Sequence, residues 1–284
     1  MRLKLLFAVG AVIAAAKALK HLAEEKMIPG GHSSLGRALL SKSPIFRTRV
    51  AYDKDLARAA AYLCEGTYLG QEETEKRMAA LGFSDPVSKH YASDTAMNAS
   101  PITAASEIVS AQDGNYLIVA AAVRGTHPAD IGDYLTDIRS GLFNIDGFSD
   151  AGDVGTEAVR EYCALRQERY GIGVDHTILF ITGHSLGAAV AGQIAGNLED
   201  VVATRQNIFA YTFASPNYET RGKETSDYKN IHNVINAKDL VPHFPLGSKR
   251  YGVDHIFEGK ASNPFKHHEM PAHLAGIKSG IGKQ

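Results

Sequence analysis

Apolar and polar positions along the chain follow two different periods. Several short runs are rich in β-branched and aromatic residues, which is typical of buried strands, and other stretches carry apolar residues at helical spacing. The runs that predict strands are 107–110, 116–123, 177–182, 207–215 and 231–237. The stretches that predict helices are 52–64, 155–170 and the small-residue run that follows residue 185. Strands and helices that alternate in this way predict an α/β domain.

The first two predicted strands are expected to form a hairpin. Asp113-Gly114-Asn115 is a turn signal between residues 107–110 and residues 116–123. The second run is the more apolar of the two, so we expect it to lie deeper in the sheet.

Loops are expected before the predicted hairpin and before the helix predicted at 155–170. Small and polar residues indicate loops at 83–101 and 149–154. The helix expected from about residue 155 to residue 170 carries three apolar side chains on one face, which predicts core packing. These are Ala158, Tyr162 and Leu165.

The strand at 177–182 runs into Gly183-His184-Ser185-Leu186-Gly187. A G-x-S-x-G between a strand and a helix makes a turn so sharp that glycines must flank the serine, whose hydroxyl then projects outward. The five-residue pattern is weak by itself, because βα turns often contain glycine and serine. The flanking strand and helix strengthen it. Ser185 is therefore a candidate nucleophile, and the rest of the chain must supply a base, an acid and an oxyanion hole.

The acid and the base are sought after the serine, since proteins with such an elbow carry serine, acid and histidine in that order. Asp239 follows the strand at 231–237, and ligands gather at the carboxyl ends of strands in open α/β sheets. Asp254 is the alternative acid, and an ordinary turn residue is the alternative role for Asp239. The histidines downstream of Asp239 are His243, His255, His267, His268 and His273. We expect the base from the loop at 265–270, because His243 is too close to Asp239 and the stretch around His255 has strand character.

Val123-Arg124-Gly125-Thr126-His127 ends the strand at 116–123. A glycine just past a buried strand lets the backbone approach a ligand, and a helix that starts soon afterwards leaves free N–H groups nearby. An ordinary βα turn is the alternative interpretation.

Composition and charge exclude some classes of function. The formal net charge is −1 and acidic and basic residues are mixed, so we expect no nucleic-acid partner. Cys64 and Cys163 lie on apolar, helix-like stretches without a CxxC spacing, which predicts buried free thiols, with a single disulfide as the alternative. The 12 histidines include no H-E-x-x-H pattern, so we expect no metal.

The first 28 residues have the character of a targeting segment. Arg2 and Lys4 precede a short apolar core at 5–16 that ends in three alanines, as in a secretory signal peptide, and this core is short for a bilayer span. We therefore expect a secreted or membrane-associated protein. An amphipathic membrane anchor and a cytoplasmic terminal helix are the alternatives. A linker is expected at 29–44 and the folded domain at 45–284.

Taken together, these pieces resemble the class 3 lipases, the α/β-hydrolase family of the fungal triacylglycerol lipases and many bacterial relatives. The resemblance runs from about Tyr52 to Leu274. It implies a mostly parallel central sheet with helices on both faces. Its motifs, in chain order, are Val123-Arg124-Gly125-Thr126 for F-R-G-T, Asp133-Tyr134-Leu135-Thr136-Asp137-Ile138 for D-W-x-x-D-L, Gly147-Phe148, the elbow at 182–187, Phe213-Ala214-Ser215-Pro216 for F-G-S-P, residues 236–242 for N-x-x-D-x-V-P, and residues 268–274 for the H-x-M-x-x-Y-L of bacterial members.

The resemblance assigns roles residue by residue. It implies Ser185 as nucleophile, Asp239 as acid and His268 as base, with His267 leaving the register open by one residue. The oxyanion donors it implies are the backbone N–H groups of Thr126 and Leu186. It places His127, Asp133 and Tyr134 against the substrate and residues 128–133 in a lid. Valine before Arg124, tyrosine at 134 and His273 in place of a tyrosine depart from the family pattern.

The function implied is hydrolysis of carboxylic ester bonds of lipids through an acyl-enzyme on Ser185, without a cofactor. A lipid or ester is the expected partner, together with contact at a membrane or lipid-droplet interface. A phospholipase A1 or an acyltransferase with the same triad is an alternative. A catalytically silent lipid-binding protein is the alternative from a different class.

Overall fold

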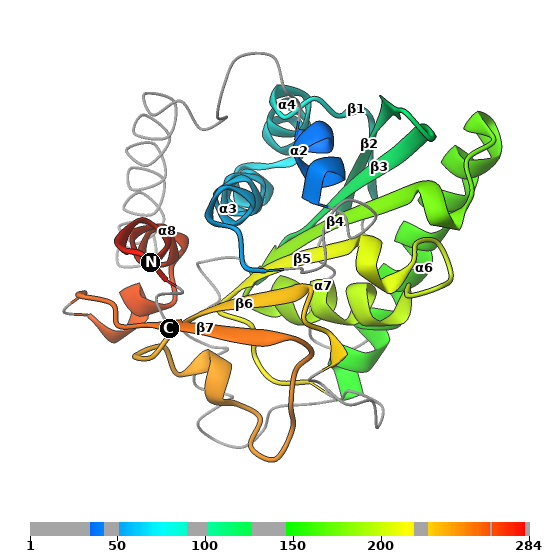
Figure 1. Cartoon of the computed structure of the whole chain (residues 1–284). Coiled ribbons are helices and arrows are strands. Elements are labelled where there is room, and N and C mark those ends of the chain that lie inside the picture. The colour runs from blue at the N-terminus through cyan, green and yellow to red at the C-terminus, as the bar shows by residue number, and fades with distance from the viewer. Residues whose placement is uncertain are drawn as a thin grey trace.

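A seven-stranded sheet forms the centre of the computed structural model, which describes residues 35–42, 51–89, 102–126, 146–218, 227–261 and 263–281. The strands lie side by side in the order in which they occur in the sequence (Figure 1). Neighbours from β1 to β3 are antiparallel, and neighbours from β3 to β7 are parallel. The strands are β1 (Ser84–Lys89), β2 (Ile102–Ala111), β3 (Gly114–Val123), β4 (Thr177–His184), β5 (Ile208–Phe213), β6 (Ile231–Asn236) and β7 (Val253–Phe257).

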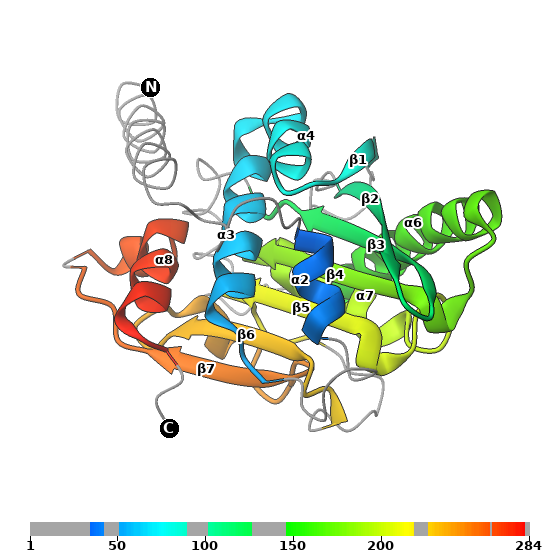
Figure 2. The ribbon, with the colours of Figure 1, turned by 45° about the horizontal axis from the view of Figure 1, so that its top comes forward.

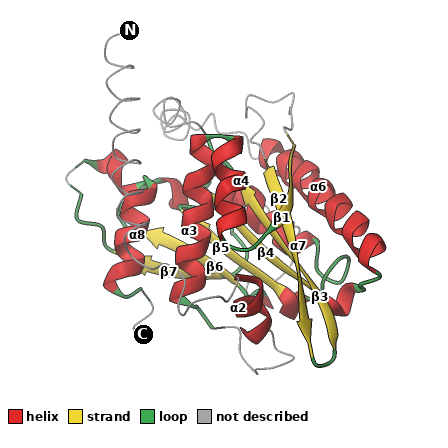
Figure 3. Cartoon of the chain, turned by 90° about the horizontal axis from the view of Figure 1, so that it is seen from above, coloured by secondary structure: helices red, strands yellow, loops and turns green. Residues whose placement is uncertain are grey.

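Helices cover both faces of this sheet. In Figure 2, α2, α3 and α8 lie in front of the strands, and α6 and α7 lie behind them. Figure 3 shows the front group from above, with α3 and α8 lying across the strands. The helices are α2 (Leu35–Lys42), α3 (Lys54–Leu69), α4 (Gln71–Ala80), α6 (Asp146–Tyr170), α7 (Leu186–Asn197) and α8 (Met270–Ser279). The mostly parallel sheet with helices on both faces is confirmed.

The two faces of the sheet enclose separate hydrophobic cores, because side chains alternate along a strand. In β3, Ile118 and Ala120 enter the core under α2, α3, α4 and α8, whereas Leu117 and Val119 enter the core under α6 and α7. A strand buried on both sides is predominantly apolar along its length. This explains the unbroken apolar runs in the sequence.

The strands and the first helix predicted from the sequence are present. β2 and β3 form the expected hairpin, paired from Ile102 with Val123 to Ala111 with Gly114. Helix α3 begins after Asp53, whose carboxylate accepts hydrogen bonds from the backbone N–H groups of Asp55 and Leu56.

The prediction of a loop at 83–101 is wrong for the first part of this range. Residues 84–89 form β1, the edge strand, which pairs antiparallel with β2. Its sequence SDPVSK has a single large apolar residue and a proline, both of which weaken a strand signal. An edge strand that is exposed along its length does not need the apolar pattern of a buried one. Residues 90–101 lie outside the described residues.

The loop predicted at 149–154 is also wrong, because these residues belong to α6. The glycine at 152 suggested a break, yet it lies where the helix passes close to the Gln193 side chain of α7. Tertiary packing therefore overrides local propensity here. On the predicted apolar face, Ala158 and Tyr162 are buried, whereas Leu165 is 67 % exposed and is not a core residue.

The linker predicted at 29–44 does not hold for residues 35–42. These residues form α2, and its side chains Leu35, Leu39 and Leu40 are buried in the core under α3. The leucines of α2 recur at helical spacing, but the segment is short and its surroundings are rich in serine and glycine, which predicted a linker. The folded domain therefore includes α2, and residues 1–34 lie outside the described residues.

Two further observations concern the thiols and the membrane. Cys64 and Cys163 are buried and free, as predicted. Burial raises the pKa of each thiol to about 12, so both remain protonated at neutral pH. Within the described ranges, none of the helices is long and apolar enough to span a bilayer.

Candidate active site

The turn between β4 and α7 holds Ser185 in an unusual backbone conformation. Its φ of 58° and ψ of −128° lie in a region that residues other than glycine rarely adopt. A Cβ on Gly183 would meet backbone atoms of Gly187 at less than 3.0 Å, so glycine is required where the chain reverses. The strand, the turn and the helix together have the geometry predicted for a nucleophile elbow.

Three side chains from different loops meet at this turn. The Oγ of Ser185 lies 2.8 Å from Nε2 of His268, and Nδ1 of His268 lies 2.7 Å from Oδ2 of Asp239. All three residues are buried. Because a carboxylate can only accept, Nδ1 of His268 donates to Asp239 and Nε2 is left to accept the proton of Ser185. This arrangement allows the histidine to remove the serine proton.

The electrostatics of Asp239 suit a charged carboxylate. Burial alone would raise its pKa, but the neighbouring His268 and the hydrogen bond to it outweigh burial, so the pKa of Asp239 lies below its ordinary value. The backbone N–H of Val241 donates to its other oxygen, Oδ1, over 3.1 Å. Asp239 is therefore ionised at neutral pH and oriented toward His268.

The loop that carries Asp239 is braced by Asn236 at the end of β6. The amide oxygen of Asn236 accepts hydrogen bonds from the backbone N–H groups of Lys238 and Gly259. Its amide nitrogen faces His267, 3.1 Å from Nδ1 and 3.1 Å from the carbonyl oxygen. Asn236 thus joins the loop of Asp239 to the segment of His267 and His268.

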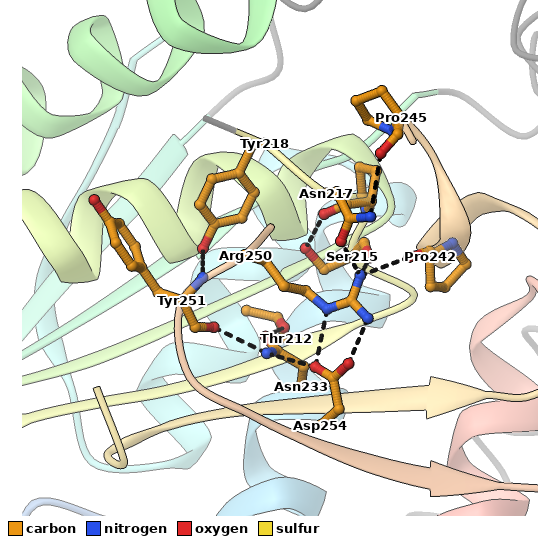
Figure 4. A network of polar contacts seen from close by, with 11 residues as sticks. Thr212, Ser215, Asn217, Tyr218, Asn233, Pro242, Pro245, Arg250, Tyr251 and Asp254 are labelled. Carbon is orange, nitrogen blue, oxygen red and sulfur yellow. Dashed lines mark hydrogen bonds and ion pairs between the residues drawn. The ribbon is translucent and has the colours of Figure 1, made fainter. Parts of the chain in front are cut away.

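A second brace is the guanidinium of Arg250, shown in Figure 4. It pairs with both carboxylate oxygens of Asp254 and donates to the carbonyl oxygen of Pro242, three residues after Asp239. It also donates to the carbonyl oxygen of Ser215 and to the side-chain oxygen of Asn217. One arginine therefore connects the loop after β5 to the loop of Asp239 and to β7.

The two predicted oxyanion residues lie on neighbouring strand ends. Val123 of β3 pairs with Gly183 of β4, so the loops that follow these strands lie side by side. Leu186 begins α7, and the first N–H groups of a helix have no intrahelical acceptor. The Oγ1 of Thr126 is buried and has no hydrogen-bond partner among the described residues. His127, Asp133, Tyr134 and the lid predicted at 128–133 lie outside the described residues.

The alternative acid and the other histidines have different environments. Asp254 is held by Arg250, and His255 bonds to His232 over 3.0 Å between ring nitrogens. His273 is buried on α8, with its ring near those of Phe213, Phe257 and His184. Of the five histidines downstream of Asp239, His268 is the one whose ring is hydrogen-bonded to the serine in the described part of the chain.

Sequence reasoning missed the bracing residues. Arg250 and Asp254 are four residues apart, but their spacing gives no hint that the guanidinium also reaches Pro242 and Ser215. Tyr68 near the end of α3 bonds to His184, which lies 116 positions away in the sequence. No local pattern signals a contact of this kind.

The fold and the elbow together define an α/β-hydrolase fold. Residues 120–249 match the model of the family Lipase (class 3). Phospholipase A1-II 1 of rice, Oryza sativa subsp. indica, is 28 % identical over 124 residues, which cover 38 % of this chain and 31 % of that protein. The match therefore spans less than a third of that relative's length.

Solved structures show the same fold at low sequence identity. The Rhizomucor miehei lipase in its native propeptide complex is 16 % identical, with a TM-score of 0.52, covering 82 % of this chain and 83 % of that chain. A triacylglycerol lipase described as having a serine protease triad at its catalytic centre is also 16 % identical, with a TM-score of 0.52, covering 75 % of this chain and 83 % of that chain.

Residues 120–249 are thus similar to the class 3 lipase family, and the solved structures share the fold of the chain. The relatives named here are from a plant and a fungus, so the likeness of residues 268–274 to bacterial members stays a prediction.

Proposed function

We propose that the protein is a serine hydrolase that cleaves carboxylic ester bonds of lipids through an acyl-enzyme on Ser185. The observation that carries this proposal is the unbroken chain of contacts from Ser185 through His268 to Asp239. The strained backbone of Ser185 supports it, because strain of this kind is stored where it serves a mechanism.

In the first half of the reaction, Ser185 is acylated. As its Oγ attacks the ester carbonyl carbon, Nε2 of His268 takes the hydroxyl proton. Asp239 stabilises the imidazolium that forms. The N–H groups of Leu186 and Thr126 bind the oxyanion of the tetrahedral intermediate, each donor contributing on the order of 3 kcal/mol. His268 then protonates the leaving alcohol, and the acyl group stays on Ser185.

In the second half, water replaces the alcohol. His268 takes a proton from the water as it attacks the acyl carbon, and the same backbone N–H groups bind the second oxyanion. Collapse releases the fatty acid and returns the proton to Ser185. Every proton transfer uses a group that the chain itself supplies.

A phospholipase A1 is the second candidate, and the partial match to the rice phospholipase A1-II 1 favours it. The two candidates share the triad and differ in the head group next to the scissile ester. A hydrolysis screen over head group and acyl chain length, with and without an oil–water interface, separates them. We expect turnover of short-chain esters in either case, and preferential turnover of triacylglycerol if the acylglycerol lipase proposal is correct. Preferential release of the sn-1 chain from phosphatidylcholine would support the second candidate instead.

A silent lipid-binding protein is separated from both candidates by active-site labelling. A fluorophosphonate forms a covalent bond with a serine that is activated by a base. We expect one equivalent of label on the wild-type chain and none on Ser185→Ala. A wild-type chain that binds lipid but takes up no label would contradict the enzyme proposal.

Lipid substrates also imply a place of action. We propose that the protein works at a membrane or lipid-droplet interface and that its first 28 residues direct it there. Fractionation of cells that produce the full chain and a chain lacking residues 1–28 tests this. Recovery of the full chain in the cytosolic fraction, and not with membranes, would contradict the proposal.

A further inference from the structure

Two side chains outside the predicted triad connect it to the oxyanion loop. The hydroxyl of Tyr68 lies 2.7 Å from Nδ1 of His184, and Nε2 of His184 lies 2.7 Å from the carbonyl oxygen of His268. His184 is the residue before Ser185, and His268 is the predicted base. The imidazole of His184 therefore sits between a tyrosine of α3 and the backbone of the base.

The direction of each hydrogen bond follows from chemistry. The carbonyl oxygen of His268 can only accept, so Nε2 of His184 carries the proton and donates. Burial, followed by the nearby His268 and His273, holds the pKa of His184 well below its ordinary value, so the ring is neutral. Its Nδ1 is then a bare acceptor, and the hydroxyl of Tyr68 must donate to it.

The oxygen of Tyr68 is linked on its other side to the oxyanion loop. Burial raises the pKa of Tyr68, and a hydrogen bond from the backbone of Gly125 partly offsets this rise. Gly125 precedes Thr126, the predicted oxyanion residue. A Cβ on Gly125 would lie 2.6 Å from the Tyr68 hydroxyl and 3.1 Å from Cβ of Ser185, so only glycine permits this close approach.

These contacts form one path, which runs from Gly125 through Tyr68 and His184 to His268. We infer that Tyr68 and His184 are positioning residues that set the oxyanion loop and the backbone of the predicted base at a fixed separation across the nucleophile. The inference rests on the proposed function. Neither side chain contacts the reacting atoms; each acts through the groups it holds. A small misplacement of catalytic groups is costly, since rates depend steeply on the alignment of reacting atoms.

A merely structural hydrogen bond would have a different signature. Its loss lowers the free energy of unfolding, but it leaves kcat of the folded protein unchanged. The hydroxyl of Tyr211 provides the matched control, because it is buried and accepts one hydrogen bond from the backbone N–H of Asp53. It lies on β5, outside the path described above.

The experiment compares the full-length wild type with Tyr68→Phe, His184→Gln, the double variant and Tyr211→Phe. It measures kcat and KM for p-nitrophenyl butyrate, the rate of fluorophosphonate labelling and the thermal midpoint. We expect Tyr68→Phe to lower kcat and the labelling rate roughly tenfold with little change in KM. His184→Gln, which removes the acceptor for Tyr68, is expected to do at least as much. The double variant should be no worse than His184→Gln alone, since both changes break one path.

The control and the wild type distinguish failure of this inference from failure of the proposed function. Tyr211→Phe is expected to lower the thermal midpoint about as much as Tyr68→Phe while keeping kcat. If Tyr68→Phe also keeps kcat within twofold, or if the double variant shows additive losses, the positioning role is wrong and the esterase proposal stands. A wild type without turnover and without labelling overturns the proposed function and the inference with it.

A readout that does not depend on turnover tests the path directly. Nuclear magnetic resonance of the chain with ¹⁵N-labelled histidine identifies the tautomer of His184. We expect the Nε2–H form at neutral pH, with an Nδ1 signal that shifts in Tyr68→Phe. An Nδ1–H form would mean that His184 cannot accept from Tyr68, and it would overturn the inference.

Discussion

Asn236 donates a hydrogen bond from its side-chain nitrogen to the carbonyl oxygen of His267, over 3.1 Å, immediately before His268. The same side chain accepts from the backbone of Lys238, next to Asp239. The predicted acid and base thus share one brace. If this brace sets the distance between Asp239 and His268, its removal must affect the rate as well as the stability.

Asn236→Ala tests this. Loss of the side-chain amide leaves buried backbone groups without partners. We therefore expect the free energy of unfolding to fall by about 2 kcal/mol and kcat to fall roughly tenfold. Asn230→Ala is the matched control, because Asn230 is a buried asparagine that bonds to the carbonyl oxygens of Arg205 and Ile208 away from the site. Denaturant unfolding and ester hydrolysis are measured on both. Equal effects of the two variants on kcat would show that Asn236 has no special relation to the site.

The adjacent histidines test the register of the last motif. His268→Ala removes the proposed general base, and we expect kcat to fall by a factor on the order of 10³ or more. His267→Ala removes a ring that faces Asn236, and we expect a much smaller loss of kcat. Steady-state kinetics on the two purified variants give the comparison directly. A larger loss of kcat in His267→Ala would show that His267, and not His268, is the base.

Arg250 is expected to contribute to both stability and catalysis. Arg250→Lys keeps the charge but cannot reproduce the fork that reaches Asp254 and Pro242, so we expect the free energy of unfolding to fall by about 2 kcal/mol. We also expect kcat to fall, since Pro242 lies on the loop of Asp239. Arg160→Lys, which alters an exposed pair with Glu157, should change neither quantity. If Arg250→Lys changed neither the free energy of unfolding nor kcat, the hydrogen bonds of Arg250 would contribute to neither.

Helix α2 is expected to be an integral part of the core. Leu39 is fully buried, so Leu39→Ala should lower the free energy of unfolding by about 3 kcal/mol. Leu165→Ala, at a position that is 67 % exposed, should change it by less than about 0.5 kcal/mol. Denaturant unfolding measures both. The reverse order would restore the interpretation of residues 29–44 as a linker and of Leu165 as a core residue.

Buried neutral histidines make the fold sensitive to acid. Burial, followed by His255, lowers the pKa of His232 to about 3, and burial lowers the pKa of His273 to about 4. In the unfolded chain a histidine takes up a proton below a pH of about 6.5. The unfolded state therefore binds more protons between a pH of about 6.5 and these values, and stability falls as the pH is lowered through that window. Each group contributes about 1.4 kcal/mol per pH unit within it.

His232→Leu isolates one of these groups. At pH 7.5 its difference from the wild type in free energy of unfolding reports packing and the lost hydrogen bond to His255, without proton uptake, because the wild-type histidine is neutral in both states. At pH 4.5 we expect the variant to gain relative to the wild type, since it no longer takes up a proton on unfolding. Urea unfolding at both pH values measures the change. A difference that is the same at the two pH values would show that His232 is not held neutral.

The parts of the fold that sequence could predict are those buried on both sides. The side chains of β3 and β4 alternate between two cores, so both strands are mostly apolar and their apolar runs stand out. β1 is exposed and carries a proline, and α6 contains glycines that packing against α7 tolerates. Their structure is imposed by contacts with other elements, which local propensity does not encode.

The candidate site divides in the same way. The elbow could be found because the sharp turn requires glycine two positions before and two positions after Ser185, which leaves a local pattern. His268 reaches Ser185 across 83 positions, and only a family resemblance singled it out from its neighbours. Tyr68 and Arg250 left no local pattern for their roles, since Tyr68 bonds to His184 and Arg250 bonds to Ser215 and Asn217, all far away in the sequence.

The central claim is that Ser185 forms the acyl-enzyme, and hydrolysis of p-nitrophenyl butyrate by the wild type and by Ser185→Ala tests it most directly. Circular dichroism of both proteins establishes that they are equally folded. We expect turnover by the wild type and a loss of at least 10³-fold in the variant, in which no nucleophile remains. A folded Ser185→Ala protein that retains wild-type turnover would contradict the account.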